Sequence, residues 1–298
     1  MMQALRKSVA SAIQYGFGSA GVRKAGSVIS ITERSPEPPK VSVRGITQRY
    51  QNGNKTPLIA LEDINLQIQA GEFVCIVGPS GCGKSTLLHM IAGLIRPSEG
   101  EVWIDDRRVE NTGTDRILIF QELGLFPWLT VAQNVEFGMR HGKGMGKRER
   151  RARVAEYLKL VHLGQFPDSY VHQLSGGMRQ RVALARALAT EPDVLLMDEP
   201  FAALDAQTRD LLHDELEKIW AHTGCTIIFV THNVREAVRL GDRVLVMTFR
   251  PGRIKREFHI ELPRPRSLED PEVALTARDI LQDLREEIDK SLELEYAK

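Results

Sequence analysis

The segment GPSGCGKST, residues 78–86, has the residue types and the spacing of a loop that binds phosphate. Its glycines allow backbone dihedrals at which successive N–H groups converge on one anion. Lys84 can reach the outer phosphates of a nucleotide, and the Ser85 hydroxyl can bind Mg²⁺. The alternative is a glycine-rich turn, which the preceding apolar run and the following helical pattern disfavour. The candidate phosphate-binding residues are Gly78, Pro79, Ser80, Gly81, Cys82, Gly83, Lys84, Ser85 and Thr86.

Two adjacent acids, Asp198 and Glu199, follow the apolar run VLLM. Open α/β sheets bind their ligands at the carboxyl ends of such strands. Neighbouring side chains on a strand point to opposite sides, so the two carboxylates take different roles. We expect Asp198 to hold Mg²⁺ and Glu199 to orient and deprotonate a water that attacks the γ-phosphate. A surface acid pair is the alternative.

A second anion-binding pattern lies in QLSGGMRQRVALARAL, residues 173–188. Here Ser175, Gly176 and Gly177 stand at a predicted helix start, where backbone N–H groups are free to bind an anion. A chain that already has a phosphate loop does not need a second one for the same nucleotide.

Alternating strands and helices position these residues. The pattern predicts a largely parallel sheet that is buried on both faces. A mostly helical block, residues 124–190, is too long for a simple crossover and indicates a subdomain. We expect helices at about 84–95, 206–222, 234–240 and 277–292, the last with Ile280, Leu284 and Ile288 on one face. The expected strands are VSVRGITQRY, LEDINLQIQ, FVCIV, EVWID, RILIF, VLLMD, TIIFVT and RVLVM.

Composition limits the classes of function. The 298 residues include 40 basic and 39 acidic ones, so the net charge of +1 excludes a whole-protein nucleic-acid footprint. Three widely spaced cysteines exclude a disulfide scaffold and fit a reducing compartment. The apolar runs are strand-sized and far below the roughly 20 residues that span a bilayer, so we expect no membrane crossing.

Residues 1–40 differ from the rest in having no acidic residue before Glu33 and a proline-rich end. We favour a flexible extension. A surface helix with Leu5, Val9 and Ile13 on one side and a transit-type peptide stay as alternatives.

A basic run begins at Lys143 and continues with Lys147, Arg148, Arg150, Arg151 and Arg153. It contains no aromatic residue that could stack on a base. We therefore interpret it as a solvated helix start, with proximity to acidic lipid as the lesser alternative.

Six motifs in order give the chain a resemblance to the ATP-binding-cassette (ABC) transporter ATPases over roughly residues 41–255. GPSGCGKST resembles the Walker A loop, LLMDEP the Walker B strand and LSGGMRQ the family signature. The others are IFQE with Gln121, AALD with Asp205 and VTHN with His232.

The resemblance implies that two copies of the chain sandwich two ATP molecules head to tail. Ser175, Gly176 and Gly177 then bind the γ-phosphate of the partner's ATP, and Asp205 acts across the same interface. The resemblance also implies that His232 bonds the γ-phosphate, and that Gln121 contacts Mg²⁺ or the water and senses a membrane partner. Tyr50 would stack on adenine. Core packing is the alternative for both His232 and Tyr50.

Two further segments, LFPWLTV from residue 125 and RPGRI from residue 250, are similar to the nitrate, sulfonate, taurine and bicarbonate importer branch. That branch implies transmembrane permease subunits, an indirect partnership with a periplasmic solute-binding protein, no nucleic acid, and the cytoplasmic face of the bacterial inner membrane. Phe126, Pro127 and Trp128 would receive the permease, with ordinary packing of Trp128 as the alternative.

We therefore expect an α/β fold with a mostly parallel P-loop NTPase sheet, an antiparallel β subdomain and an inserted helical subdomain at about 124–181. The predicted divisions are an extension (1–40), an ATPase domain (41–262) and a C-terminal helical tail (263–298). The alternative function is a non-transport ABC ATPase that acts on DNA or ribosomes. A P-loop kinase would have no use for LSGGMRQ. We also expect a bulky thiol reagent to modify Cys82 and ATP to protect it.

Overall fold

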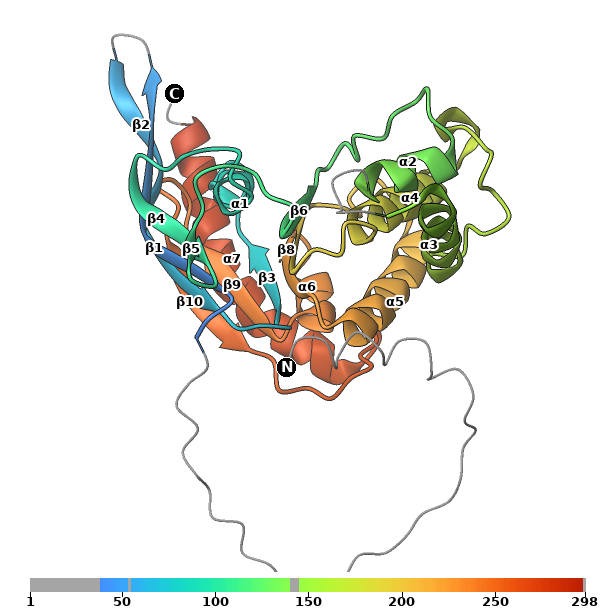
Figure 1. Cartoon of the computed structure of the whole chain (residues 1–298). Coiled ribbons are helices and arrows are strands. Elements are labelled where there is room, and N and C mark those ends of the chain that lie inside the picture. The colour runs from blue at the N-terminus through green and yellow to red at the C-terminus, as the bar shows by residue number, and fades with distance from the viewer. Residues whose placement is uncertain (1–37, 53–54, 140–144, 297–298) are drawn as a thin grey trace, which may run out of the picture. The chain divides into compact units, whose positions relative to one another are not determined.

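The computed structural model describes residues 38–52, 55–139 and 145–296 (Figure 1), all within one compact unit. The expectations for the extension before residue 38, and that for Lys143, lie outside the described residues. Among the described residues, no helix combines the length and the apolar composition needed to cross a membrane.

A six-stranded sheet forms the centre of the unit, in the order β10-β9-β3-β8-β7-β6. Strands β9, β3, β8, β7 and β6 are parallel, and β10 pairs with β9 in the antiparallel sense. Strands β3, β7 and β8 are fully buried, as their uninterrupted apolar sequences predict. The bounds are β3 Phe73–Val77, β6 Arg116–Ile119, β7 Val194–Asp198, β8 Thr226–Val230, β9 Arg243–Met247 and β10 Ile254–His259.

A second, antiparallel sheet has the order β2-β1-β4-β5. Its long pair β1 and β2 places Tyr50 opposite Leu58, close to the end of β1 and the start of β2. Buried side chains of this sheet pack with those of α1 and of one face of the central sheet. The bounds are β1 Val41–Asn52, β2 Lys55–Ile68, β4 Glu99–Ile104 and β5 Arg107–Arg108.

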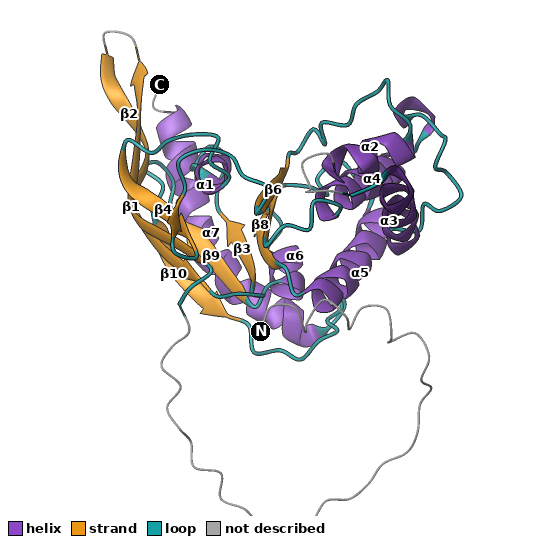
Figure 2. Cartoon of the chain, in the orientation of Figure 1, coloured by secondary structure: helices purple, strands orange, loops and turns teal. Residues whose placement is uncertain are grey.

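Three helices, α2 Val131–Gly138, α3 Lys147–Leu160 and α4 Gly176–Leu188, gather on the opposite side of the unit from the antiparallel sheet (Figure 2). The basic run starts α3, and Lys147, Arg148 and Arg151 are exposed, as predicted. The remaining helices are α1 Lys84–Ile91, α5 Ala206–Thr223, α6 Val234–Leu240 and α7 Pro271–Tyr296. The α/β fold with its two sheets and inserted helices is confirmed. The division at residues 262 and 263 stays a prediction.

The last helix departs from expectation. Helix α7 is longer than the predicted 277–292, and it packs on α6 and β9. Ile280 and Leu284, expected on one face with Ile288, are buried, whereas Ile288 is 38% exposed, so only the first part of that apolar face is covered. The carboxylate-bearing Glu287 occupies the buried position instead. Hydrophobic periodicity cannot detect a buried position that is filled by a charged residue with partners.

Two other boundaries differ. Helix α1 ends at Ile91, where Gly93 at φ +78° turns the chain, and not near residue 95. Strand β6 lies at an edge of its sheet, and Phe120 after it is exposed. The short apolar run RILIF therefore indicated the strand correctly but overstated its burial.

Candidate nucleotide-binding site

The phosphate loop connects the buried strand β3 to helix α1. Gly83 is the N-cap of α1 at φ +107°, and no side chain of the described residues caps that end. The first N–H groups of the helix are thus left for a ligand, with the positive end of the helix dipole behind them. Only glycine fits, because a Cβ on Gly83 would lie 2.5 Å from Leu61 Cδ2.

A cavity of about 290 Å³ opens over this loop, close to the lower end of the size range of small-molecule sites. One wall comes from the antiparallel sheet and the other from the phosphate loop. Tyr50 lies in the first wall and is 39% exposed, so it is available to stack on a base and is not core packing. The lining residues are Tyr50, Leu58, Ala60, Ser80, Gly81, Gly83, Lys84, Ser85, Thr86, Glu199 and Arg250.

Lys84 lines the cavity with most of its side chain buried. Its Nζ donates to the carbonyl oxygens of Gly78 at 2.8 Å and Pro79 at 3.0 Å. The ammonium therefore stays inside the loop through contacts that phosphate oxygens would complement or replace. Gly78 and Pro79 therefore contact the Lys84 ammonium, and they do not line the cavity.

Cys82 does not fit the expectation of a reagent-accessible thiol. Its side chain is fully buried, and its Sγ points inward, close to where a Cβ on Gly78 would stand. Burial raises the pKa of the Cys82 thiol, although the nearby Lys84 charge lowers it. This burial argues against the expectation that a bulky reagent modifies Cys82 readily, because the turn of the loop directs the side chain under the backbone.

Asp198 ends strand β7 beside the phosphate loop. Its Oδ1 accepts a hydrogen bond from Ser85 Oγ at 3.1 Å. Burial raises the pKa of Asp198, and the Ser85 hydrogen bond opposes this effect. One hydroxyl and one carboxylate fit Mg²⁺, which takes few protein ligands and completes its shell with phosphate oxygens and water. Among the described residues, no group of three or more His, Cys, Asp or Glu side chains forms an independent metal cage.

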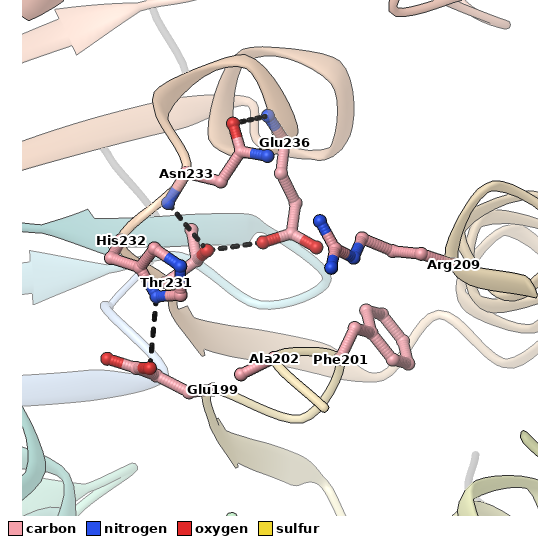
Figure 3. A pocket seen from close by; sticks show the side chains of 8 residues that line it. All are labelled: Glu199, Phe201, Ala202, Arg209, Thr231, His232, Asn233 and Glu236. Carbon is pink, nitrogen blue, oxygen red and sulfur yellow. Dashed lines mark hydrogen bonds and ion pairs between the residues drawn. The ribbon is translucent and has the colours of Figure 1, made fainter. Parts of the chain in front are cut away.

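Glu199 lines the cavity over the phosphate loop, and it also lines a second, smaller pocket, where its carboxylate meets His232 (Figure 3). His232 Nδ1 lies 3.0 Å from Glu199 Oε2, and since a carboxylate accepts hydrogen bonds, Nδ1 carries the proton. The His232 side chain is 63% exposed, so it is not a core histidine. Glu199 has φ +44°, an uncommon backbone conformation for a non-glycine residue.

A buried network holds the segment that carries His232 (Figure 3). Thr231 Oγ1 bonds the carboxylate of Glu236, and the Asn233 N–H donates to Thr231 Oγ1 at 3.0 Å. Glu236 Oε1 also contacts His213 Nε2 at 2.6 Å. The roles of His213, Thr231 and Glu236 in this network were not predicted from the sequence, although Glu236 stands only four residues after His232. Their contacts restrict the position of the His232 backbone.

The signature residues lie apart from the cavity. Ser175 is the exposed N-cap of α4, and its Oγ accepts from the Met178 N–H at 3.3 Å. Gly176 and Gly177 form the first turn of α4. None of the three lines the cavity over the phosphate loop.

Asp205 and Gln121 also lie outside that lining. Asp205 is the exposed N-cap of α5, and its bond from the Thr208 N–H holds the pKa of its carboxyl below the usual value. Gln121 is exposed and lies two residues beyond the end of β6. The structure brings together the phosphate loop, Tyr50, Asp198, Glu199 and His232, but not the signature, Asp205 or Gln121.

Comparison with known proteins identifies the family. The model of the ABC transporter family matches residues 61–202. The nitrate import ATP-binding protein NrtD of Synechocystis sp. is 51% identical over 211 residues, which cover 71% of this chain and 79% of NrtD. This chain belongs to the ABC transporter family. It is an ABC-type, ATP-binding ATPase.

Two further matches agree. The taurine import ATP-binding protein TauB of Ruegeria pomeroyi is 44% identical over 220 residues, 74% of this chain and 82% of TauB. A solved dimeric ATP-binding cassette in a post-hydrolysis state, bound to ADP and Pi, is 37% identical. It covers 75% of this ABC ATPase and 100% of the solved chain, with a TM-score of 0.67. The predicted relationship to importer ATPases is confirmed at the level of these similarities.

Proposed function

We propose that this ABC ATPase drives the import of a small solute as a head-to-tail dimer bound to a membrane permease. One observation carries the proposal: the phosphate loop lines a cavity, whereas Ser175 at the signature loop is exposed and does not line it. A second copy of the chain, placed head to tail, would supply each cavity with the anion-binding helix start that it lacks.

Within one copy, Lys84 and the N–H groups at the start of α1 bind the phosphates of ATP. Ser85 and Asp198 hold Mg²⁺, which supplies charge stabilisation to the phosphates. Glu199 orients and deprotonates the attacking water, and His232 bonds the γ-phosphate from the side of the Glu199 carboxylate. Tyr50 stacks on the adenine. Gln121 contacts the metal or the water.

From the second copy, Ser175, Gly176 and Gly177 bind the γ-phosphate of the first copy's ATP, and Asp205 contacts the same interface. The Ser175 oxygen accepts from the Met178 N–H, so its own O–H proton remains available to donate to a phosphate oxygen while the cap bond is kept.

The permease is proposed to contact Phe126, Pro127 and Trp128. Trp128 is 69% exposed, which argues against ordinary packing. It stands beside Phe126, with ring centroids 5.5 Å apart. An exposed tryptophan that stands on a partly buried phenylalanine suits an anchor at a protein interface. The complex would lie on the cytoplasmic face of the bacterial inner membrane and receive solute from a periplasmic binding protein. We propose a solute of the nitrate, sulfonate, taurine and bicarbonate class, and the names of two relatives support nitrate and taurine within it.

The dimer is tested with Glu199→Gln, which keeps the side-chain size but removes the base. We expect this variant to bind MgATP, to hydrolyse it at least about a hundredfold more slowly, and to elute as a dimer only with MgATP. Adding Ser175→Arg should return it to a monomer that still binds nucleotide. Wild-type turnover in Glu199→Gln, or ATP-dependent dimers in the double variant, would contradict the proposed roles.

The permease is tested by capture of the tagged chain from detergent-solubilised native membranes, with Trp128→Ala as the comparison. We expect a multi-spanning protein to be captured with the wild type and lost with Trp128→Ala. Capture of DNA- or ribosome-associated proteins alone would leave the ATPase chemistry intact and overturn the transport role.

A further inference from the structure

Arg250 lines the nucleotide cavity but belongs to none of the residues expected to bind nucleotide. It stands in the turn of residues 248–253 that joins β9 to β10. Its Nε donates to the Gly81 carbonyl oxygen at 2.7 Å, and a Cβ on Gly81 would lie 2.7 Å from Arg250 Nη2. The guanidinium therefore lies directly against the phosphate loop, although the two segments are far apart in the sequence.

The charge of Arg250 is unpaired among the described residues, where no carboxylate lies within ion-pair distance of it. Arg253 in the same turn provides the contrast, because its Nη2 lies 2.6 Å from Glu62 Oε2. Arg250 therefore directs an uncompensated cation and free N–H donors to a cavity that also contains Lys84. Because only Nε is engaged among the described residues, both terminal nitrogens of the guanidinium keep their N–H donors free, and their planar arrangement matches phosphate oxygens.

The turn that carries Arg250 is fixed on the side of the antiparallel sheet. Gly252 N–H donates to the Ala60 carbonyl oxygen at 3.0 Å, and the Glu62 N–H donates to the Gly252 carbonyl oxygen at 3.0 Å. A side chain at Gly252 would collide with the carbonyl oxygen of Cys82 in the phosphate loop. The backbone of the turn is therefore packed between β2 and the phosphate loop.

Helix α7 fixes the same turn from another direction. The carboxylate of Glu287 is 2% exposed and accepts from the Phe249 N–H at 3.0 Å, next to Arg250. Lys290 at 2.7 Å and Lys255 at 3.2 Å supply its counter-charges. Burial alone would raise the pKa of Glu287, but these bonds hold it below the usual value. A buried carboxylate needs all of these partners, so it strongly constrains the backbone at Phe249.

We propose that Arg250 is a nucleotide-contacting residue that binds the phosphate chain, and that Glu287 is the positioning residue that holds its turn in place. The inference rests on the assignment of the cavity to nucleotide and adds to it a link with the C-terminal helix. Part of the affinity for nucleotide is then set by α7, through Glu287, Phe249 and Arg250.

The direct contact is tested in the full chain by calorimetric titration with MgADP and with a non-hydrolysable MgATP analogue. Arg250→Ala should raise both dissociation constants about tenfold, as expected for a charge-assisted hydrogen bond. The loss should shrink at high salt. Arg250→Lys keeps the charge but lacks the planar guanidinium. Its dissociation constants should lie between those of the wild type and Arg250→Ala. Arg253→Ala is the matched control in the same turn, and we expect it to bind as the wild type does.

The positioning role is tested with Glu287→Gln against Glu286→Gln. Glu286 is exposed and also pairs with Lys255, which makes it a matched control. Glu287→Gln should raise the dissociation constant about threefold or more, and Glu286→Gln should not. In an Arg250→Ala background, Glu287→Gln should have no further effect on affinity. A purely structural role would leave affinity unchanged or give additive effects in the double variant, and either result would overturn the positioning role.

The results distinguish failure of the Arg250 contact from failure of the assignment of the cavity to nucleotide. If the wild type binds nucleotide and Arg250→Ala binds it equally well, Arg250 makes no contact and the inference fails alone. If the wild type binds no nucleotide, or Lys84→Ala does not weaken binding, the assignment of the cavity fails and the inference fails with it.

Discussion

Helices α1 and α4 both begin at glycine-bearing loops, yet their first turns are built differently. The α1 start has Gly83 as its N-cap, has no side-chain cap, and faces a cavity. The α4 start has Ser175 as its N-cap, which satisfies the Met178 N–H itself, and it is exposed. A helix start without a side-chain cap leaves its N–H groups free to bind a ligand. A capped start satisfies part of these N–H groups itself and is stable in water without an anion.

The strongest test of this contrast removes the cation at the start of α1. Lys84→Ala should lower ATP hydrolysis at least about a hundredfold and weaken nucleotide binding, because its ammonium is the charge nearest the expected phosphates. Turnover of ATP and the dissociation constant for MgADP are the measurements. Lys218→Ala, at an exposed position on α5, is the control. Near-normal hydrolysis by Lys84→Ala would contradict this contrast, because the start of α1 would then not be the phosphate site used in catalysis.

A paired glycine substitution sharpens the contrast. Gly83→Ala should destabilise the fold by about 2 kcal/mol or more, because φ is +107° and the new methyl group would collide with Leu61. Gly176→Ala should leave stability nearly unchanged, since its Cβ would meet only Leu204 Cδ2 at 3.5 Å. Urea denaturation measures both. Equal losses of stability would show that the two loops are constrained alike.

The rate of thiol labelling should differ between the phosphate loop and the signature loop. Cys82 is buried and burial raises its pKa, so at neutral pH a maleimide should label it at least about tenfold more slowly than an introduced thiol in Ser175→Cys. The Cys82 rate should rise as pH increases toward its raised pKa, because the thiolate is the reactive form. Mass spectrometry of labelled peptides gives both rates. Fast labelling of Cys82 at neutral pH would contradict the buried placement.

The smallest expected effect concerns the cap itself. Ser175→Ala should cost about 1 kcal/mol of unfolding free energy, the usual loss for an N-cap side chain. Nucleotide binding by the monomer should not change, because Ser175 does not line the cavity. Urea unfolding and MgADP titration on the same sample test the two statements. A weakened monomer affinity would place Ser175 in its own chain's site.

The sequence predicted most of the elements that hold the site. The uninterrupted apolar runs of β3, β7 and β8 admit few alternatives to buried strands, and glycine with lysine after β3 specifies the phosphate loop. The pair Asp198 and Glu199 was placed correctly at the end of β7, because the carboxyl ends of parallel strands share one edge.

What the sequence could not give depends on tertiary register. Nothing local to RPGRI predicts that Arg250 contacts Gly81, since that contact depends on how β2 and β9 lie beside the phosphate loop. Glu287 resembles a solvent-facing helix residue until its partners, Lys255 and Phe249, are placed by the fold. The inward direction of Cys82 similarly follows from the path of the loop backbone and not from residue type.

The cavity has one wall from each of the two sheets. Tyr50 and Leu58 belong to the antiparallel sheet, and Ser80, Lys84 and Ser85 belong to the loop of the parallel one. A nucleotide that fills the cavity therefore contacts both layers of the fold, and its binding stabilises the folded state. By mass action it adds about 2.7 kcal/mol to the unfolding free energy when free nucleotide is at a hundred times its dissociation constant. The melting temperature of this ATPase should consequently rise with the concentration of free nucleotide.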